Sequence, residues 1–155
     1  MSEGEALYLE AMSKAEADDS NEGRMHIAKL LEMASSLGSG QASLAIANWI
    51  HYGIYYENDP SKEYEMVKLA VAQGNVSAYF TLGSMMEEGI EGILQKNAGS
   101  AFMNYVSGAL CGDSDCFMEV SRCYFYGIGT RKNKKLSEVW RLHGKKRGGN
   151  FIERS

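Results

Sequence analysis

The chain has 155 residues, of which 45% are hydrophobic and 23% charged, and a formal net charge of −4, a composition typical of one globular domain. No apolar run is long enough to cross a bilayer, and the acidic start MSEGEALYLEAMSKAEADD lacks the features of a secretory signal, so we expect a cytoplasmic protein. The odd set Cys111, Cys116 and Cys123 argues against a disulfide framework. No further ligands accompany these cysteines, so we expect small apolar residues and no metal site.

The two ends of the chain carry opposite charge. Residues 1–22 hold seven acidic residues and one basic residue, Lys14. Within this end of the chain, residues 5–17 and 24–38 fit a degenerate helix pair. From Gly127 onward there are nine basic residues against two acidic ones. Such runs are either solvated surface or the docking site of an oppositely charged partner.

Three segments that end in glycine repeat one pattern, at residues 41–53, 76–89 and 115–127. The matching columns are Ala42/Ala78/Cys116, Ile46/Leu82/Val120, Ala47/Gly83/Ser121 and Gly53/Gly89/Gly127, and a second glycine column holds Gly38, Gly74, Gly112 and Gly148. A fixed period of this kind indicates stacked helix pairs. The small columns let helices approach closely, so we expect Gly83→Leu to destabilise the protein strongly and Gly83→Ala mildly.

Each repeat predicts two helices with defined ends. The first helix stops at the glycine of the Gly53 column, where a left-handed residue is favoured. A loop leads to a capping residue, which is Asp59 before Pro60, then Asn97, then Asn133. The second helices follow at residues 62–74, 100–112 and 135–148.

The stretch Gly127-Ile-Gly-Thr130 looks like a phosphate-binding loop. Such loops follow a strand and lead directly into a helix, whereas a helix is expected before Gly127. We therefore interpret Gly127 as the end of a helix and Gly129 as part of the following loop.

The pattern small-x-x-x-Leu-Gly-x-x-Tyr-x-x-Gly, with a loop, an Asp/Asn cap and a helix that ends in Ala-Ala-x-x-Gly, resembles the Sel-one-like repeats (SLR), which are relatives of tetratricopeptide repeats. The best match is NVSAYFTLGSMMEEG, and the resemblance covers residues 24–148. At Gly144-Lys145 the chain departs from Ala-Ala, so the last helix either packs like an internal one or forms a polar cap. The resemblance implies an all-α, right-handed superhelix of about three and a half helix pairs. It implies one domain over residues 1–155, with a degenerate unit (1–38), three repeats (39–74, 75–112 and 113–148) and a tail (149–155).

No catalytic constellation is apparent in the sequence, because His26, His51 and His143 fall in different repeats and no nucleophile motif is present. We therefore expect no enzyme activity, no cofactor and no metal. The candidate site is a surface on the first helices, where aromatic anchors alternate with polar groups. Its candidate residues are Asn48, Tyr52, Tyr79, Ser84, Glu88, Phe117, Arg122 and Tyr126. The alternative for each aromatic residue is burial under a neighbouring helix.

The resemblance implies a non-catalytic protein-binding module of the scaffold or adaptor type. Some bacterial members of such families are immunity proteins, and a small acidic chain suits the inhibition of a basic toxin domain. One alternative is nucleic-acid binding through the basic C-terminal helix, although the net charge is negative. Another is a regulatory adaptor in a signalling complex. The oligomeric state is left open by the sequence.

Overall fold

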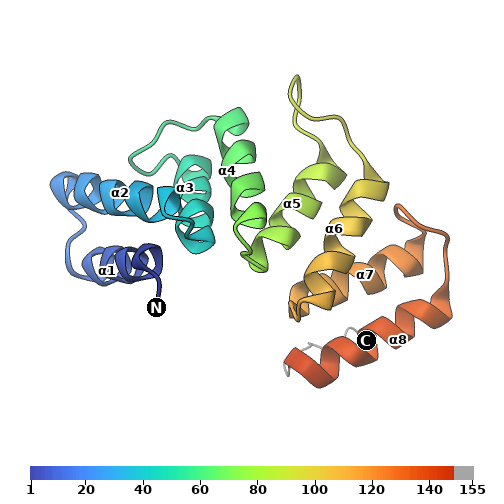
Figure 1. Ribbon diagram of the computed structural model, residues 1–155. Helices are drawn as coiled ribbons and strands as arrows, with labels where there is room; N and C mark the ends of the chain where they lie inside the picture. The colour runs from blue at the N-terminus through green and yellow to red at the C-terminus, as the bar shows by residue number, and fades with distance from the viewer. Residues whose placement is uncertain (149–155) are drawn as a thin grey trace. The chain divides into compact units, whose positions relative to one another are not determined.

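The computed structural model describes residues 1–148, and its regular structure is helical (Figure 1). The helices of this part of the chain are α1 (Glu3–Ala17), α2 (Asn21–Ser36), α3 (Gly40–Tyr52), α4 (Pro60–Ala72), α5 (Ser77–Glu88), α6 (Ala98–Leu110), α7 (Ser114–Tyr126) and α8 (Lys134–Gly148). Residues 1–148 contain no β-strand, which confirms the all-α class, and none of their helices is long and apolar enough to span a membrane. The predicted tail at 149–155 lies outside the described residues.

The chain divides into two compact units, Met1–Asn75 with α1 to α4 and Val76–Ser155 with α5 to α8. Each unit has its own hydrophobic core. The core of the first unit includes Leu31, Ile46 and Ile50. The core of the second unit includes Tyr105 and Val120. Each unit holds two helix pairs, and the organisation as a single domain remains a prediction.

The predicted helix caps are confirmed. The Asp59 carboxylate accepts the backbone N–H groups of Ser61 and Lys62, with Pro60 as the first helical residue of α4. The Asn97 side chain caps α6 through the N–H of Ser100 at 2.9 Å. Asn133 caps α8 in the same way, 3.0 Å from the N–H of Leu136. These bonds satisfy N–H groups that have no partner inside the helix.

The Gly-x-Gly of the α7–α8 loop has a structural role. Gly127 ends α7 in the left-handed conformation with φ 73°, as predicted. Gly129 also has a positive φ of 66°, and a Cβ there would overlap the carbonyl oxygen of Ala98 at the start of α6. The second glycine is therefore required by the close passage of this loop over α6.

Gly83 provides the closest fit between α5 and α6. A Cβ on Gly83 would lie 2.5 Å from Cε1 of Tyr105, whose ring is almost fully buried. Ala47 occupies the same repeat position in the first unit and does carry a Cβ. The expectation that Gly83→Ala is mild is therefore wrong, because the buried Tyr105 ring would have to move.

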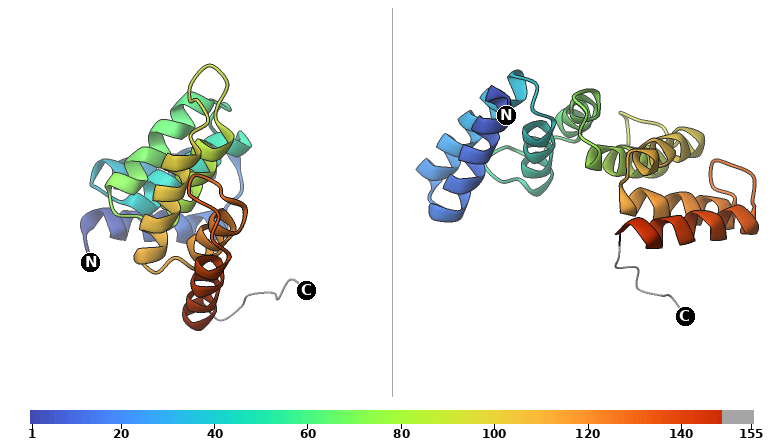
Figure 2. Two further views of the ribbon diagram at one scale, coloured as in Figure 1. Left: turned by 90° about the vertical axis from the view of Figure 1, so that its right-hand side faces the viewer. Right: turned by 60° about the horizontal axis from the view of Figure 1, so that its bottom comes forward.

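The last helix has one packed side and one exposed side. α7 and α8 lie side by side in Figures 1 and 2, and the hydroxyls of Ser121 and Ser137 each donate to the other's carbonyl at 2.8 Å. Gly144 is buried, but Lys145 is exposed where Ala109 of α6 is fully buried. Of the two alternatives for this helix, the structure therefore favours the polar cap.

Candidate partner-binding surface

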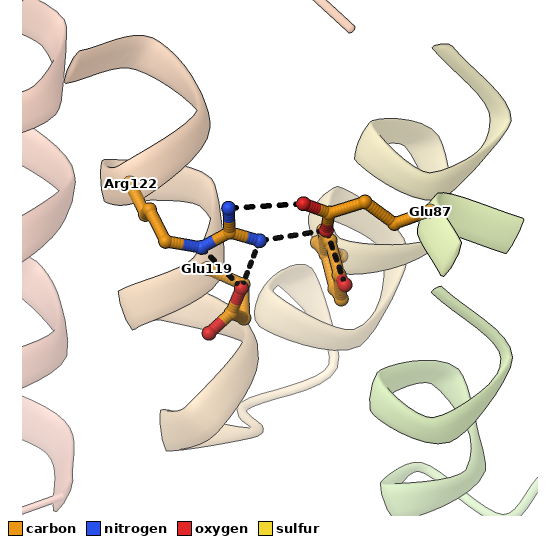
Figure 3. A network of polar contacts seen from close by, with 4 residues as sticks. Glu87, Glu119 and Arg122 are labelled. Carbon is orange, nitrogen blue, oxygen red and sulfur yellow. Dashed lines mark hydrogen bonds and ion pairs between the residues drawn. The ribbon is translucent and has the colours of Figure 1, made fainter. Parts of the chain in front are cut away.

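A cluster of charged side chains connects α5 and α7 in the second unit. Arg122 on α7 lies between Glu119 of the same helix and Glu87 at the end of α5 (Figure 3). Its Nη1 donates to Glu87 Oε1 at 3.0 Å and its Nη2 donates to Glu87 Oε2 at 2.7 Å. Its Nε donates to Glu119 Oε2 at 2.7 Å. The guanidinium is therefore held in a bidentate pair on one side and by a third bond on the other. We call these three residues the Arg122 cluster.

Packing positions the Arg122 cluster. Glu119 and Arg122 are three residues apart and so face the same side of α7. Because Gly83 has no side chain, Tyr105 of α6 can pack against α5, and its hydroxyl donates to Glu87 Oε2 at 2.9 Å. The Glu87 carboxylate is thus fixed by one bond from α6 and two from α7.

The charges of the cluster stabilise one another. Hydrogen bonding to Arg122 is the main cause that lowers the pKa of Glu87, and the bond to Glu87 is the main cause that raises the pKa of Arg122. Burial, followed by the bond to Glu87, raises the pKa of the Tyr105 hydroxyl. These shifts keep Glu87 negatively charged and Arg122 positively charged at neutral pH. The Arg122 side chain is still 33% exposed, so a partner can reach it.

The eight candidate residues are placed as follows. Tyr52 and Tyr126 are well exposed at 74% and 67%, and Asn48 and Glu88 are also exposed. Tyr79, Ser84 and Arg122 are half-buried. Asn48 and Tyr52 belong to the first unit, and the other six belong to the second.

Phe117 is a core residue, and its prediction as a binding anchor is wrong. It is only 6% exposed, and its ring centroid lies 5.5 Å from that of Trp140 on α8. Tyr79 packs against the same core with part of its surface. The second helix of the repeat covers this flank of α7, which is the burial alternative stated for the aromatic residues.

Glu87 is the residue that the sequence did not identify as part of this surface. The Glu119–Arg122 spacing already indicates an ion pair on one helix face. No pattern in the sequence connects Glu87 with Arg122, because their pairing depends on how α5 packs beside α7. Glu88, which was predicted instead, is exposed, and adjacent residues of a helix do not share a face.

An exposed tyrosine recurs at the same repeat position in both units. In α3, Tyr52 packs edge-to-face on His51 with ring centroids 4.9 Å apart. In α7, Tyr126 packs on Phe125 in the same manner, also at 4.9 Å. Exposed aromatic rings at the ends of first helices are suitable anchors for a protein partner.

The first unit contains a different polar network, which is neutral and partly buried. Ser43 Oγ donates to Gln73 Oε1 at 2.5 Å, and Gln73 Nε2 donates to the Ser35 carbonyl at 2.9 Å. The network joins α2, α3 and the residue that caps the end of α4. An open groove of about 470 Å³ adjoins it, lined in part by Glu32, Tyr56 and Leu69.

The histidines and cysteines of the described residues were the other candidates for chemistry. In residues 1–148, no group of three His, Cys, Asp or Glu side chains is arranged to hold a metal ion. His51 pairs with Glu63, with Nδ1 and Oε1 3.0 Å apart. Cys116 and Cys123 are buried and Cys111 is exposed, all three as free thiols.

The fold is that of known Sel1 repeat structures. The crystal structure of a Sel1 repeat protein from Oxalobacter formigenes is similar over 94% of this chain, with a TM-score of 0.80 and 18% identity. A protective antigen of uropathogenic Escherichia coli strains with an SLR fold is similar over 95% of this chain, with a TM-score of 0.81 and 20% identity. This chain spans 57% and 31% of the lengths of those two chains. No sequence model of a known family matches the chain, and a sequence search of curated proteins gives no match. The resemblance to the SLR solenoids is thus confirmed for the fold.

Proposed function

We propose that the protein is a non-catalytic protein-binding module, and that its binding surface lies on the first helices of the second unit. The observation that carries this proposal is Arg122, a charged side chain that three hydrogen bonds hold in place while a third of it stays exposed. A partner that meets a pre-positioned side chain loses less conformational entropy on binding. Exposed Tyr126 and Glu88 supply an aromatic anchor and a further charge in the same unit.

The charge of the surface favours a basic partner. Glu87 and Glu119 outnumber Arg122, and Glu88 adds a further negative charge. Opposite charge accelerates association and disfavours acidic competitors. We therefore propose a basic protein domain as the partner, and inhibition of a bacterial toxin in the cytoplasm as the specific role. The net charge of −4 also favours a positively charged partner.

The test compares variants of exposed residues in one binding assay. Wild-type protein is immobilised, captured proteins are identified, and their affinity is measured by calorimetry. Tyr126→Ala should weaken binding of the partner by about 2 kcal/mol, as loss of an aromatic anchor commonly does. Glu88→Lys should weaken it as well, more strongly at low salt, because a positive charge then faces a basic partner.

Glu57→Lys in the loop of the first unit is the matched control, since it makes the same charge change at another exposed position. Circular dichroism and thermal melts establish that each variant is folded. If the partner binds Tyr126→Ala and Glu88→Lys as tightly as wild type, the proposed surface is wrong. If the captured protein is a toxin, adding the chain should also reduce its activity.

Nucleic-acid binding through α8 is the competing function. Its support is the series of exposed basic residues Lys134, Lys135 and Lys145. A shift assay with mixed DNA and RNA at low salt separates the two functions, because phosphate contacts weaken steeply with added salt. We expect no shift; a salt-sensitive shift that is lost in Lys135→Glu would favour this competing function.

A further inference from the structure

We propose that the protein associates with a second copy of itself, with the outer side of α1 in one copy packed against the outer side of α8 in the next. This inference is independent of the partner surface proposed above. It rests on two exposed helix faces, one in each unit, whose charges are opposite.

The outer side of α1 is acidic with an apolar centre, and we call it the acidic face. α1 buries Gly4 and Ala11 against the rest of its unit. Glu5, Leu9 and Glu16 fall on the opposite side by helical spacing, and all three are exposed. Exposed Glu10 flanks Leu9. A leucine surrounded by carboxylates suits an apolar surface with a basic rim.

The outer side of α8 has the complementary character, and we call it the basic face. α8 buries Ser137 and Gly144 toward α7. Lys135, Val139 and Leu142 lie on the opposite side at spacings of four and three residues, and all are exposed. Leu136 and Lys145 are exposed at the two flanks of this face. Leu136, Val139 and Leu142 thus place three exposed aliphatic side chains within about two turns of one helix, so they are grouped rather than scattered singly.

The sign of the charges selects which faces meet. Contact between two acidic faces would place Glu10 and Glu16 against their own copies, and contact between two basic faces would do the same for Lys135 and Lys145. Like charges brought together oppose association, whereas an acidic face on a basic face gains both opposite charge and apolar contact. The contact is therefore heterologous, and each copy offers one face of each kind. Such head-to-tail contacts form a ring where the rotation between copies closes and an open filament where it does not.

The experiment is sedimentation velocity on the full chain over a concentration series from about 10 μM to about 1 mM, the range expected of a small polar interface. The wild-type average mass should rise with concentration and fall with added salt. Two double variants reverse the charge of one face each: Glu10→Lys/Glu16→Lys on α1, and Lys135→Glu/Lys145→Glu on α8. Each alone should raise the dissociation constant by about tenfold or more, because like charges then meet.

An equimolar mixture of the two variants should recover association, since the reversed α1 of one then matches the reversed α8 of the other. Lys29→Glu on α2 is the exposed control and should leave association unchanged. Circular dichroism and melts are recorded for every variant, and a double variant that does not fold is replaced by Glu10→Lys or Lys135→Glu alone. A wild type that stays monomeric throughout overturns the proposal. A mixture that fails to recover association also overturns it. So does a result in which only one of the two double variants loses association, because that would indicate contact between like faces.

Discussion

The two units are built from the same helix pairs but are held together by different polar contacts. In the first unit, Gln73 joins α2, α3 and the end of α4 through neutral hydroxyl, amide and carbonyl groups. In the second unit, Arg122 joins α5 and α7 through two carboxylates at the surface. The neutral groups of the first network bond to one another within their own unit and carry no net charge. The charges of the Arg122 cluster are partly exposed, so their electrostatic field can act on a partner. For this reason we propose the binding surface in the second unit.

The repeat position held by Gly83 in the second unit is Ala47 in the first, and substitution at these two positions tests the difference in packing with the largest expected effect. Gly83→Leu should lower the free energy of unfolding by about 3 kcal/mol or more, and Gly83→Ala by about 1–3 kcal/mol, because each displaces the Tyr105 ring. Urea unfolding measures both. Ala47→Gly at the same repeat position should cost about 1–2 kcal/mol, through helix propensity and the loss of a buried methyl group, without displacing a neighbouring ring. Equal effects at the two positions would mean that the units pack alike.

Removal of the Gln73 side chain tests the neutral network and should have an intermediate effect. Gln73→Ala removes one bond from the Ser43 hydroxyl and one from the Ser35 carbonyl, and both groups keep another partner, so the cost should be about 1 kcal/mol. Gln73→Glu keeps the shape but cannot donate to the carbonyl, so it should also destabilise. Chemical unfolding at pH 7 gives both values. A neutral outcome for Gln73→Ala would show that the network contributes little to stability.

The pH dependence of the Arg122 cluster gives the smallest expected effect. The pKa of Glu87 in the folded chain lies below its ordinary value of about 4.3, so its ion pair stabilises the fold above that pH and is lost as the pH falls through the lowered pKa. Glu87→Gln should cost about 1 kcal/mol or less at pH 7, since the pair is partly exposed.

The difference between wild type and Glu87→Gln should shrink as the pH is lowered from about 5 toward about 3. Melting curves across this range measure it, with Glu57→Gln as an exposed control that should show no such trend. A difference that stays constant with pH would mean that the Glu87 charge does not contribute.

The repeat architecture could be predicted from the sequence because each local signal acts within a few residues. The caps at Asp59, Asn97 and Asn133 and the left-handed glycines Gly53 and Gly127 are such signals, and all five are confirmed. Gly89 of the same glycine column ends α5 as predicted, but with φ 74° and ψ 168° it is not left-handed helical, so the conformation predicted there is wrong. The division into two units was not predicted, because it depends on contacts between helices rather than on any local pattern.

The candidate surface could be predicted only in part. The exposed residues Tyr52, Glu88 and Tyr126 lie where helical spacing placed them. Phe117 was misassigned because spacing gives the face of a residue on its own helix but not which neighbouring helix covers that face. Glu87 was missed for the related reason that its partner lies 35 residues away in sequence.

Because two of the three cysteines are buried, labelling of their thiols can be used to follow unfolding. Burial raises the pKa of Cys123 to about 11 and also raises that of Cys116, so neither thiol provides much reactive thiolate at neutral pH. Cys111, at the end of α6, is exposed. A maleimide dye should therefore attach to Cys111 in the native protein without any engineered cysteine. Labelling of Cys116 and Cys123 would then follow the opening of the second unit, and the number of dyes bound per chain would record that event over time.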